Sequence, residues 1–173
     1  MKIFYLFLIL FISFSIEDDE SIYEFFRDNE FSREGACGFI GNMKEVSDLD
    51  PKSVEFYFGS EDKYVYQADA GTGNFLNDGK GFGLCRWSDY EDKKSLLETC
   101  RKYGYSVGDE ECQLEFLLIQ LKNDYRRVLH YVQDNNDLKK TSNYICQNYF
   151  NENFNCEDRY QYAKECYEKF KEE

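Results

Sequence analysis

Apolar residues recur at spacings of three and four along most of the chain, which predicts a mainly helical protein. The clearest helix begins at Ser32, a residue type favoured at N-caps, and is stopped by Pro51. Its apolar stripe consists of Phe39, Ile40, Met43 and Val46. The same spacing, with Asp109 as a further N-cap and Gly104 as a stop, predicts other helices at 22–28, 89–103, 109–121, 125–133, 138–150 and 158–170.

The stretch 54–76 has a different pattern. Phe56, Phe58, Tyr64 and Tyr66 alternate with polar residues and are punctuated by glycines, which predicts a small β-hairpin or an irregular aromatic lobe. The glycine-rich turn that follows lacks the Gly-Lys-Ser/Thr ending of a phosphate loop. The order of elements therefore predicts an α+β, predominantly helical fold, in which a hairpin lobe and a helical body face each other across a cleft.

The N-terminus has the pattern of a secretory signal. Lys2 precedes an apolar run that ends at Phe14, and Ser13 and Ser15 are small residues of the kind that signal peptidase accepts. The run is shorter than the roughly 20 residues that span a bilayer, and no later segment is apolar enough to cross one. We therefore expect a signal peptide at 1–15, an extracellular protein and a single domain at 16–173, with an uncleaved anchor as the alternative.

Cysteine content agrees with export. Seven cysteines follow the apolar run, namely Cys37, Cys85, Cys100, Cys112, Cys146, Cys156 and Cys166. None belongs to a Cys-x-x-Cys pair and His130 is the only histidine, so a metal site or a Cys-His catalytic pair is not expected, and no cofactor is implied. In an oxidising compartment we expect two or three disulfides and at least one remaining thiol, with the pairing open.

The charge balance excludes one class of partner. The net charge is −13, and cleavage after residue 15 would remove Lys2 and make it −14. Such a protein cannot bind nucleic acid by neutralising phosphates. It is also repelled at long range by an anionic bacterial wall, whereas a basic protein partner would be attracted.

Four segments, in order, resemble the phage tail lysozyme family of lysozyme-like glycosidases. They are ACGFIGNM at 36–43 with SDLDP at 47–51, NFLNDGKGFGLCRW at 74–87, SVGD at 106–109 with QLEFL at 113–117, and Arg159 with Tyr162 and Ala163. The resemblance runs from about Ile22 to Phe170. It implies a lysozyme-like fold and an ancestral activity on the β-1,4 glycan strands of peptidoglycan, so that the expected partner is peptidoglycan or a related glycan.

The resemblance also raises doubt about catalysis. The family's catalytic acid is a Glu near the end of the opening helix, directly before a Ser, and that position holds Val46. Glu45 is the neighbouring residue, but one step along a helix turns a side chain by about 100°. Cleavage of a glycosidic bond needs a proton from a carboxylic acid, which valine cannot supply. We expect an impaired enzyme that binds glycan, with an active enzyme using Glu45 and a secreted interaction protein as alternatives.

Several residues are candidates for glycan binding, and each also has a plain structural interpretation. Trp87 could stack on a sugar or fill the core, and Arg86, which replaces the family's Gln, could bind a ligand carboxylate or form a surface ion pair. Asp78 could face the cleft or form an Asx-turn. Phe82 and Tyr66 could line the cleft or pack within the hairpin lobe. Residues 150–152 also depart from the Glu-Arg-Pro common in the family.

Overall fold

The computed structural model describes residues 19–152 and 156–171 of the 173-residue chain. Nearly all of its regular structure is helical. The elements are a helix at 19–28, α2 (Arg33–Ser47), α3 (Glu61–Asp69), the 3-10 turn η1 (Phe75–Asn77), α4 (Tyr90–Tyr103), α5 (Glu110–Asn123), α6 (Arg126–Asp134), α7 (Leu138–Asn148) and α8 (Cys156–Lys169). The expected signal peptide at 1–15 lies outside the described residues.

The helix boundaries follow the local signals in the sequence. The Ser32 hydroxyl accepts a hydrogen bond of 2.9 Å from the backbone N–H of Gly35, which caps the start of α2. Gly104 adopts the left-handed conformation directly after α4, a conformation that glycine reaches without steric cost. Asp109 precedes the first residue of α5. The predicted start of α2, end of α4 and start of α5 are therefore confirmed.

The predicted β-hairpin lobe is wrong. The described residues contain no strand, and pairing is limited to isolated bridges that join Phe82 to Val54 and to Trp87. Helix α3 occupies the middle of the stretch, because the Ser60 hydroxyl caps its first turn by accepting from the Lys63 N–H. The buried positions of α3 are Tyr64, Val65 and Ala68. These positions share one helical face, a pattern that the alternation of aromatic residues concealed.

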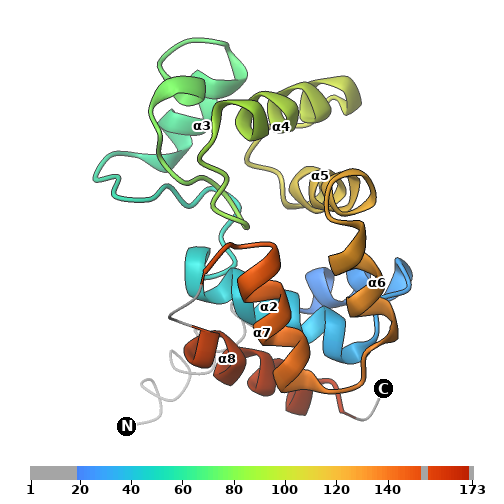
Figure 1. The fold of residues 1–173 in the computed structure, drawn as a ribbon. Helices are drawn as coiled ribbons and strands as arrows, with labels where there is room; N and C mark the ends of the chain where they lie inside the picture. Colours follow the sequence, from blue (N-terminus) through green and yellow to red (C-terminus); the bar gives the residue numbers. More distant parts are fainter. Residues whose placement is uncertain (1–18, 153–155, 172–173) are drawn as a thin grey trace, which may run out of the picture.

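The elements form two parts that are joined by α5 and α6 (Figure 1). One part holds α3, α4 and the loops around them, and the other is built on α2, which packs against α7 and α8. The close approach of α2 to α8 depends on Gly41, because a Cβ there would lie 2.4 Å from the carbonyl oxygen of Arg159. A bulkier residue would force the two helices apart, and with them one wall of the site described below.

Three disulfides join neighbouring helices, and a buried thiol remains. Cys37–Cys166 connects α2 to α8, Cys100–Cys112 connects α4 to α5, and Cys146–Cys156 connects α7 to α8. Cys85 is the free cysteine. This confirms the expected number of disulfides, which are of the kind that small exported domains use to support a limited core.

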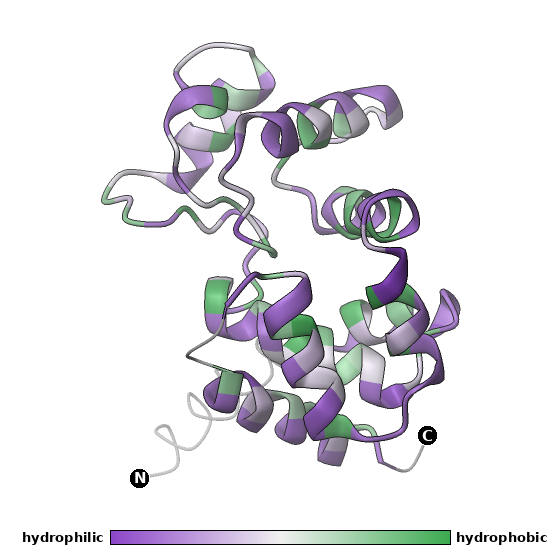
Figure 2. Cartoon of the chain, viewed as in Figure 1, coloured by the Kyte–Doolittle hydropathy of each residue, from purple (hydrophilic) through white to green (hydrophobic). Residues whose placement is uncertain are grey.

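The described helices carry both hydrophilic and hydrophobic positions (Figure 2). This is the pattern of helices that bury one face against a protein core. Within residues 19–152 and 156–171, no helix has the length and apolar character needed to cross a bilayer.

Candidate functional site

A cleft lies where the two parts of the molecule meet. It has a volume of about 310 Å³, and its walls come from the end of α2, the loop 85–89, α4, α5, the segment after α7, and α8. The lining residues are Val46, Cys85, Arg86, Trp87, Ser88, Asp89, Asp92, Gln120, Tyr125, Tyr149, Phe150, Asn151, Glu152 and Arg159. The sequence places these residues up to about 110 positions apart, so only the folded chain brings them together.

The α2 wall of the cleft is apolar at the position where the family resemblance expects the catalytic Glu. Val46 lies in the last turn of α2 and is 8% exposed, on the side that lines the cleft. Glu45 is half-buried and does not belong to the lining. The Ser47 hydroxyl bonds to the carbonyl oxygens of Met43 (2.9 Å) and Leu84 (3.2 Å), which fixes the end of the helix against the loop that leads to Trp87.

Arg86 borders the same wall. Its Nη2 donates to the carbonyl oxygen of Val46 over 3.1 Å, and its Nη1 lies 3.6 Å from a carboxylate oxygen of Glu55. The Arg86 side chain is 42% exposed, so this ion pair is screened by water. The surface ion pair considered for Arg86 is thus present, and Arg86 also belongs to the lining of the cleft.

Trp87 is held by a polar network at the back of the cleft. Its indole N–H donates to Oε1 of Gln120 over 2.8 Å, and the same oxygen accepts from the Tyr149 hydroxyl over 2.8 Å. The Gln120 amide nitrogen in turn donates to Asp92 over 2.9 Å. Trp87 is only 4% exposed and makes an edge-to-face contact with Phe116, so it does not offer an open stacking face to a sugar.

Asp89 and Asp92 of the lining act on each other at one end of the cleft, whereas the lining residue Glu152 acts on Arg159 at the other end. Burial raises the pKa of Asp92, and the negative charges of Asp89 and Asp124 raise it further, whereas the hydrogen bond from Gln120 opposes the rise. The same three carboxylates surround Tyr125, where burial is the main reason for a raised phenol pKa. This end of the cleft therefore favours neutral or positively charged groups.

Arg159 of α8 lies at the other end, near the α2 wall. Its guanidinium donates from Nη1 to Oδ1 of Asn42 over 3.1 Å and lies 5.0 Å from the ring centroid of Phe150. Asn42 is one helical turn before Val46 on α2, so both residues lie on one face of that helix. The sequence had placed Arg159 in a family motif but had given no hint that it reaches the cleft.

Cys85 offers no nucleophile to this cleft. Burial raises the pKa of its thiol, which keeps it protonated, and a protonated thiol is inert as a nucleophile. His130 is not among the residues that line the cleft with Cys85.

Three predicted binding residues lie outside the lining. Asp78 accepts from the Lys80 N–H in an Asx-turn and contacts the buried ammonium of Lys93. Phe82 is fully buried, and Tyr66 is 72% exposed on α3. The structure therefore brings together Trp87 and Arg86, but not Asp78, Phe82 and Tyr66.

The sequence interpretation missed most of the cleft. Asp89 had been assigned only as a helix start, and Asp92 and Gln120 had no signal because they are polar residues within helices. The departure from the family pattern at 150–152 was a usable signal, since Phe150, Asn151 and Glu152 all line the cleft.

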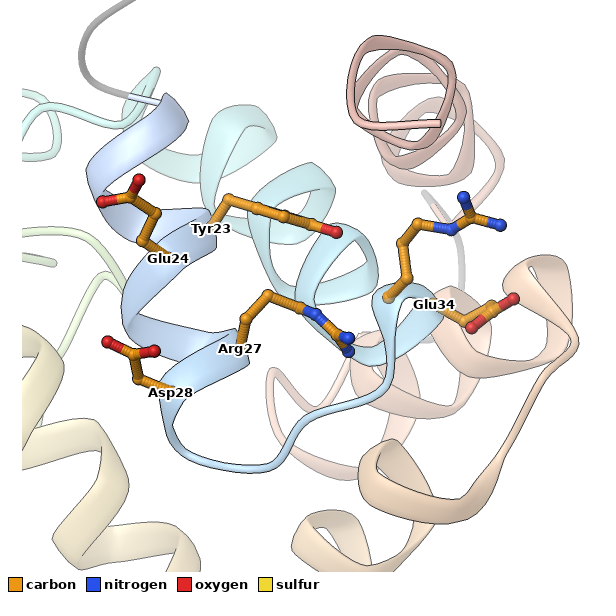
Figure 3. A pocket seen from close by; sticks show the side chains of 6 residues that line it. Tyr23, Glu24, Arg27, Asp28 and Glu34 are labelled. Carbon is orange, nitrogen blue, oxygen red and sulfur yellow. The ribbon is translucent and has the colours of Figure 1, made fainter. Parts of the chain in front are cut away.

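A second, larger hollow of about 660 Å³ lies on the surface between the helix 19–28 and the start of α2. Figure 3 shows Tyr23, Glu24, Arg27 and Asp28 along one edge of it and Glu34 on the other. Its acidic and basic side chains alternate, and none of its lining residues belongs to the segments that resemble lysozymes. The smaller cleft is the better candidate because Cys85, Arg86, Trp87 and Arg159 of those segments line it.

Comparison with known protein families shows to which family the chain belongs. The model of the family described as phage tail lysozyme matches residues 17–170. The chain belongs to the phage tail lysozyme family. A search of curated proteins found no match. Membership of the phage tail lysozyme family associates the chain with peptidoglycan and its hydrolysis, and it agrees with a cleft built from the segments at 36–51 and 74–87.

Proposed function

We propose that this protein is a secreted, lysozyme-like protein that binds bacterial cell-wall glycan in the cleft and is impaired in hydrolysing it. The observation that carries the proposal is Val46. It lines the cleft at the position where the family resemblance expects the catalytic Glu, and Glu45 beside it is not part of the lining.

The chemical consequence of Val46 is large. The leaving oxygen of a glycosidic bond must receive a proton, and a positioned carboxylic acid contributes about 10²- to 10⁴-fold to the rate. An aliphatic side chain contributes none of this. Trp87, Gln120 and Tyr149 form a connected polar network along the cleft, which supports a role in binding.

Export is part of the proposal. Three disulfides and the apolar N-terminal run support an extracellular location. The net charge of −13 disfavours tight association with an intact anionic wall, so soluble wall fragments are the more suitable ligands.

One observation favours a second candidate, an active glycosidase that uses Asp92 as its acid. Asp92 lines the cleft, and burial raises its pKa, which is the environment that a proton donor needs. Against this, Asp92 accepts a hydrogen bond from Gln120, so its carboxylate is engaged in the network that holds Trp87.

Hydrolysis of dye-labelled peptidoglycan separates the two candidates. For wild type we expect no turnover above background, and the same for Asp92→Asn and Glu45→Gln. Val46→Glu should gain activity of about 10²-fold or more relative to Val46→Gln, which has the same length but no proton to give. The gain should be larger in mild acid, because Arg159 near that wall would lower the pKa of the new carboxyl group. Wild-type turnover that is lost in Asp92→Asn or in Glu45→Gln would overturn the impaired assignment.

Binding is measured separately. The chain has a single tryptophan, and it lines the cleft, so intrinsic fluorescence reports on ligand there. We expect a saturable change with soluble peptidoglycan fragments. The absence of any change at millimolar fragment would refute glycan binding and favour a protein partner with a basic surface.

A further inference from the structure

Arg159 is the most unusual charged residue of the cleft. It is 3% exposed, and its Nε is buried without a hydrogen-bond partner. Only Nη1 makes a hydrogen bond to the described residues, to the side chain of Asn42. The guanidinium edge formed by Nε and Nη2 is left over, and this edge has the spacing that a carboxylate matches with two parallel hydrogen bonds.

No carboxylate of the described chain balances this charge at close range. No Asp or Glu oxygen in residues 19–152 and 156–171 lies within 4.0 Å of the Arg159 guanidinium, although Glu152 and Glu45 act on it from farther away. Burial lowers the pKa of Arg159, yet an arginine side chain keeps its charge in proteins. Burying a charge without a close counterion costs free energy, so binding of an anion next to Arg159 would be favourable.

The guanidinium is held in place before any ligand binds. Its acceptor, Asn42, is fully buried and donates its own amide to the carbonyl oxygens of Gly38 (2.8 Å) and Ser142 (3.2 Å). The α8 backbone at Arg159 is fixed by the close contact with Gly41. A positioned side chain loses little conformational entropy on binding, which favours affinity.

Charge along the cleft is divided in a way that suits one kind of ligand. Arg86 and Arg159 are like charges near the α2 wall, where Glu152 and Glu45 act on Arg159 without forming an ion pair with it, whereas Asp89, Asp92 and Asp124 act on one another and on Tyr125. An anionic group would therefore bind at the arginine end and be rejected at the other. The ring of Phe150 beside Arg159 adds an apolar surface for the rest of the ligand.

We propose that Arg159, assisted by Arg86, binds a carboxylate of the ligand, so that the cleft selects acidic saccharides of the muramic acid type over neutral oligosaccharides of N-acetylglucosamine. The inference rests on the proposed glycan-binding function and specifies its ligand class. The lactyl group of muramic acid carries such a carboxylate directly on the sugar ring wherever the stem peptide, which is otherwise amide-bonded to it, has been removed. The ligand carboxylate compensates a charge that the chain leaves without a close counterion.

Three disaccharide probes test this on wild-type protein, with Trp87 fluorescence and calorimetry as readouts. They are N-acetylglucosaminyl-N-acetylmuramic acid with a free lactyl carboxylate, the same disaccharide with that group converted to the amide, and N,N′-diacetylchitobiose. Because hydrogen bonds to charged groups contribute more than neutral ones, we expect the free carboxylate to bind about 10- to 100-fold more tightly than the other two.

Variants assign the selectivity to Arg159. Arg159→Met keeps the aliphatic length and should remove the preference for the carboxylate, whereas Lys164→Gln removes a positive charge from an exposed position of the same helix and should keep it. Circular dichroism establishes that each variant is folded. The probe comparison on wild type remains decisive if Arg159→Met does not fold.

The outcomes separate the two proposals. Equal binding of all three probes would overturn the carboxylate site and leave glycan binding intact. Binding of none of them would overturn glycan binding itself. A preference for the free carboxylate that persists in folded Arg159→Met would place the recognition elsewhere and refute the role of Arg159.

Discussion

Each of the two parts of the molecule buries a cationic side chain. One of these side chains is paired with a carboxylate, and the other is hydrogen-bonded to a neutral amide. Lys93 of α4 is fully buried, with its ammonium 2.6 Å from Asp78, 2.9 Å from the carbonyl oxygen of Phe75 and 3.3 Å from the Tyr64 hydroxyl. The Tyr64 hydroxyl donates to the second oxygen of Asp78 over 2.6 Å. Arg159 is equally buried, but its hydrogen bond to the described chain goes to a neutral amide.

The difference separates a structural charge from one available to a ligand. Lys93 has its counterion and hydrogen bonds within the fold, so the cluster of Lys93, Asp78 and Tyr64 ties α3, α4 and the glycine-rich turn together. Arg159 has no close counterion in the described residues and lines a cleft. A buried charge that is paired within the fold has no free hydrogen-bonding capacity for a ligand, whereas one without a close counterion remains available for recognition.

The largest effect should follow from taking the counterion away from Lys93. Asp78→Ala leaves a buried ammonium without its carboxylate, a change that costs about 3–5 kcal/mol in folding stability. Urea denaturation measures it. Asp62→Ala is the matched control, because Asp62 forms an ion pair with Lys52 at an exposed site and such pairs contribute at most about 1 kcal/mol.

An equal and small effect of the two substitutions would mean that Lys93 rearranges or loses its proton when Asp78 is removed. The cluster would then not be the structural counterpart of Arg159, and the comparison would fail on the Lys93 side.

Sequence alone predicted α2, α4 and α5 well and the stretch that contains α3 poorly. The caps at Ser32, Gly104 and Asp109 are local signals, in which a side chain or a backbone conformation acts within a few residues. Helix α3 was missed because its aromatic residues alternate as in a strand. Its true signal, the cap at Ser60, is shorter and weaker than that alternation.

The site was predictable only in the segments that carry family motifs. Val46, Arg86 and Trp87 were found in this way. Arg159 belongs to a motif too, but its burial depends on the packing of α8 on α2, which no local pattern reveals. The burial of Lys93 was missed for a similar reason. A lysine in a helix is usually solvated, and the counterion of Lys93 lies 15 residues away in the chain.

The second prediction concerns stability rather than binding in Arg159→Met. This substitution removes a buried charge without a close counterion, which is favourable, and leaves Oδ1 of Asn42 without its donor, which is unfavourable. The two effects oppose each other, so the free energy of unfolding should change by less than about 1.5 kcal/mol. Urea denaturation beside Lys164→Gln measures the change. A loss as large as that of Asp78→Ala would show that Arg159 is structural as well.

The smallest effect is expected in acid, and it is tested at the Lys93 cluster. Burial by itself would raise the pKa of Asp78, but hydrogen bonds from Lys93, Tyr64 and the Lys80 N–H outweigh it and hold the pKa below its ordinary value. A carboxyl group of this kind contributes stability above its unfolded pKa of about 3.9, and the contribution is lost as the pH falls through the lower folded value. Other carboxyl groups titrate in the same range, so the difference between wild type and a variant without the Asp78 carboxyl group reports on Asp78.

Urea midpoints between pH 5 and pH 2 measure this contribution. Wild type should lose more stability over this range than Asp78→Asn, which has no carboxyl group to titrate at that position. Arg159→Met should stay nearly parallel to the wild-type curve, because Glu152 and Glu45 act on Arg159 without forming a close ion pair with it. A flatter acid curve for Arg159→Met would reveal a carboxylate of this protein that reaches Arg159 in solution, and the site would then be occupied by the chain itself rather than left for a ligand.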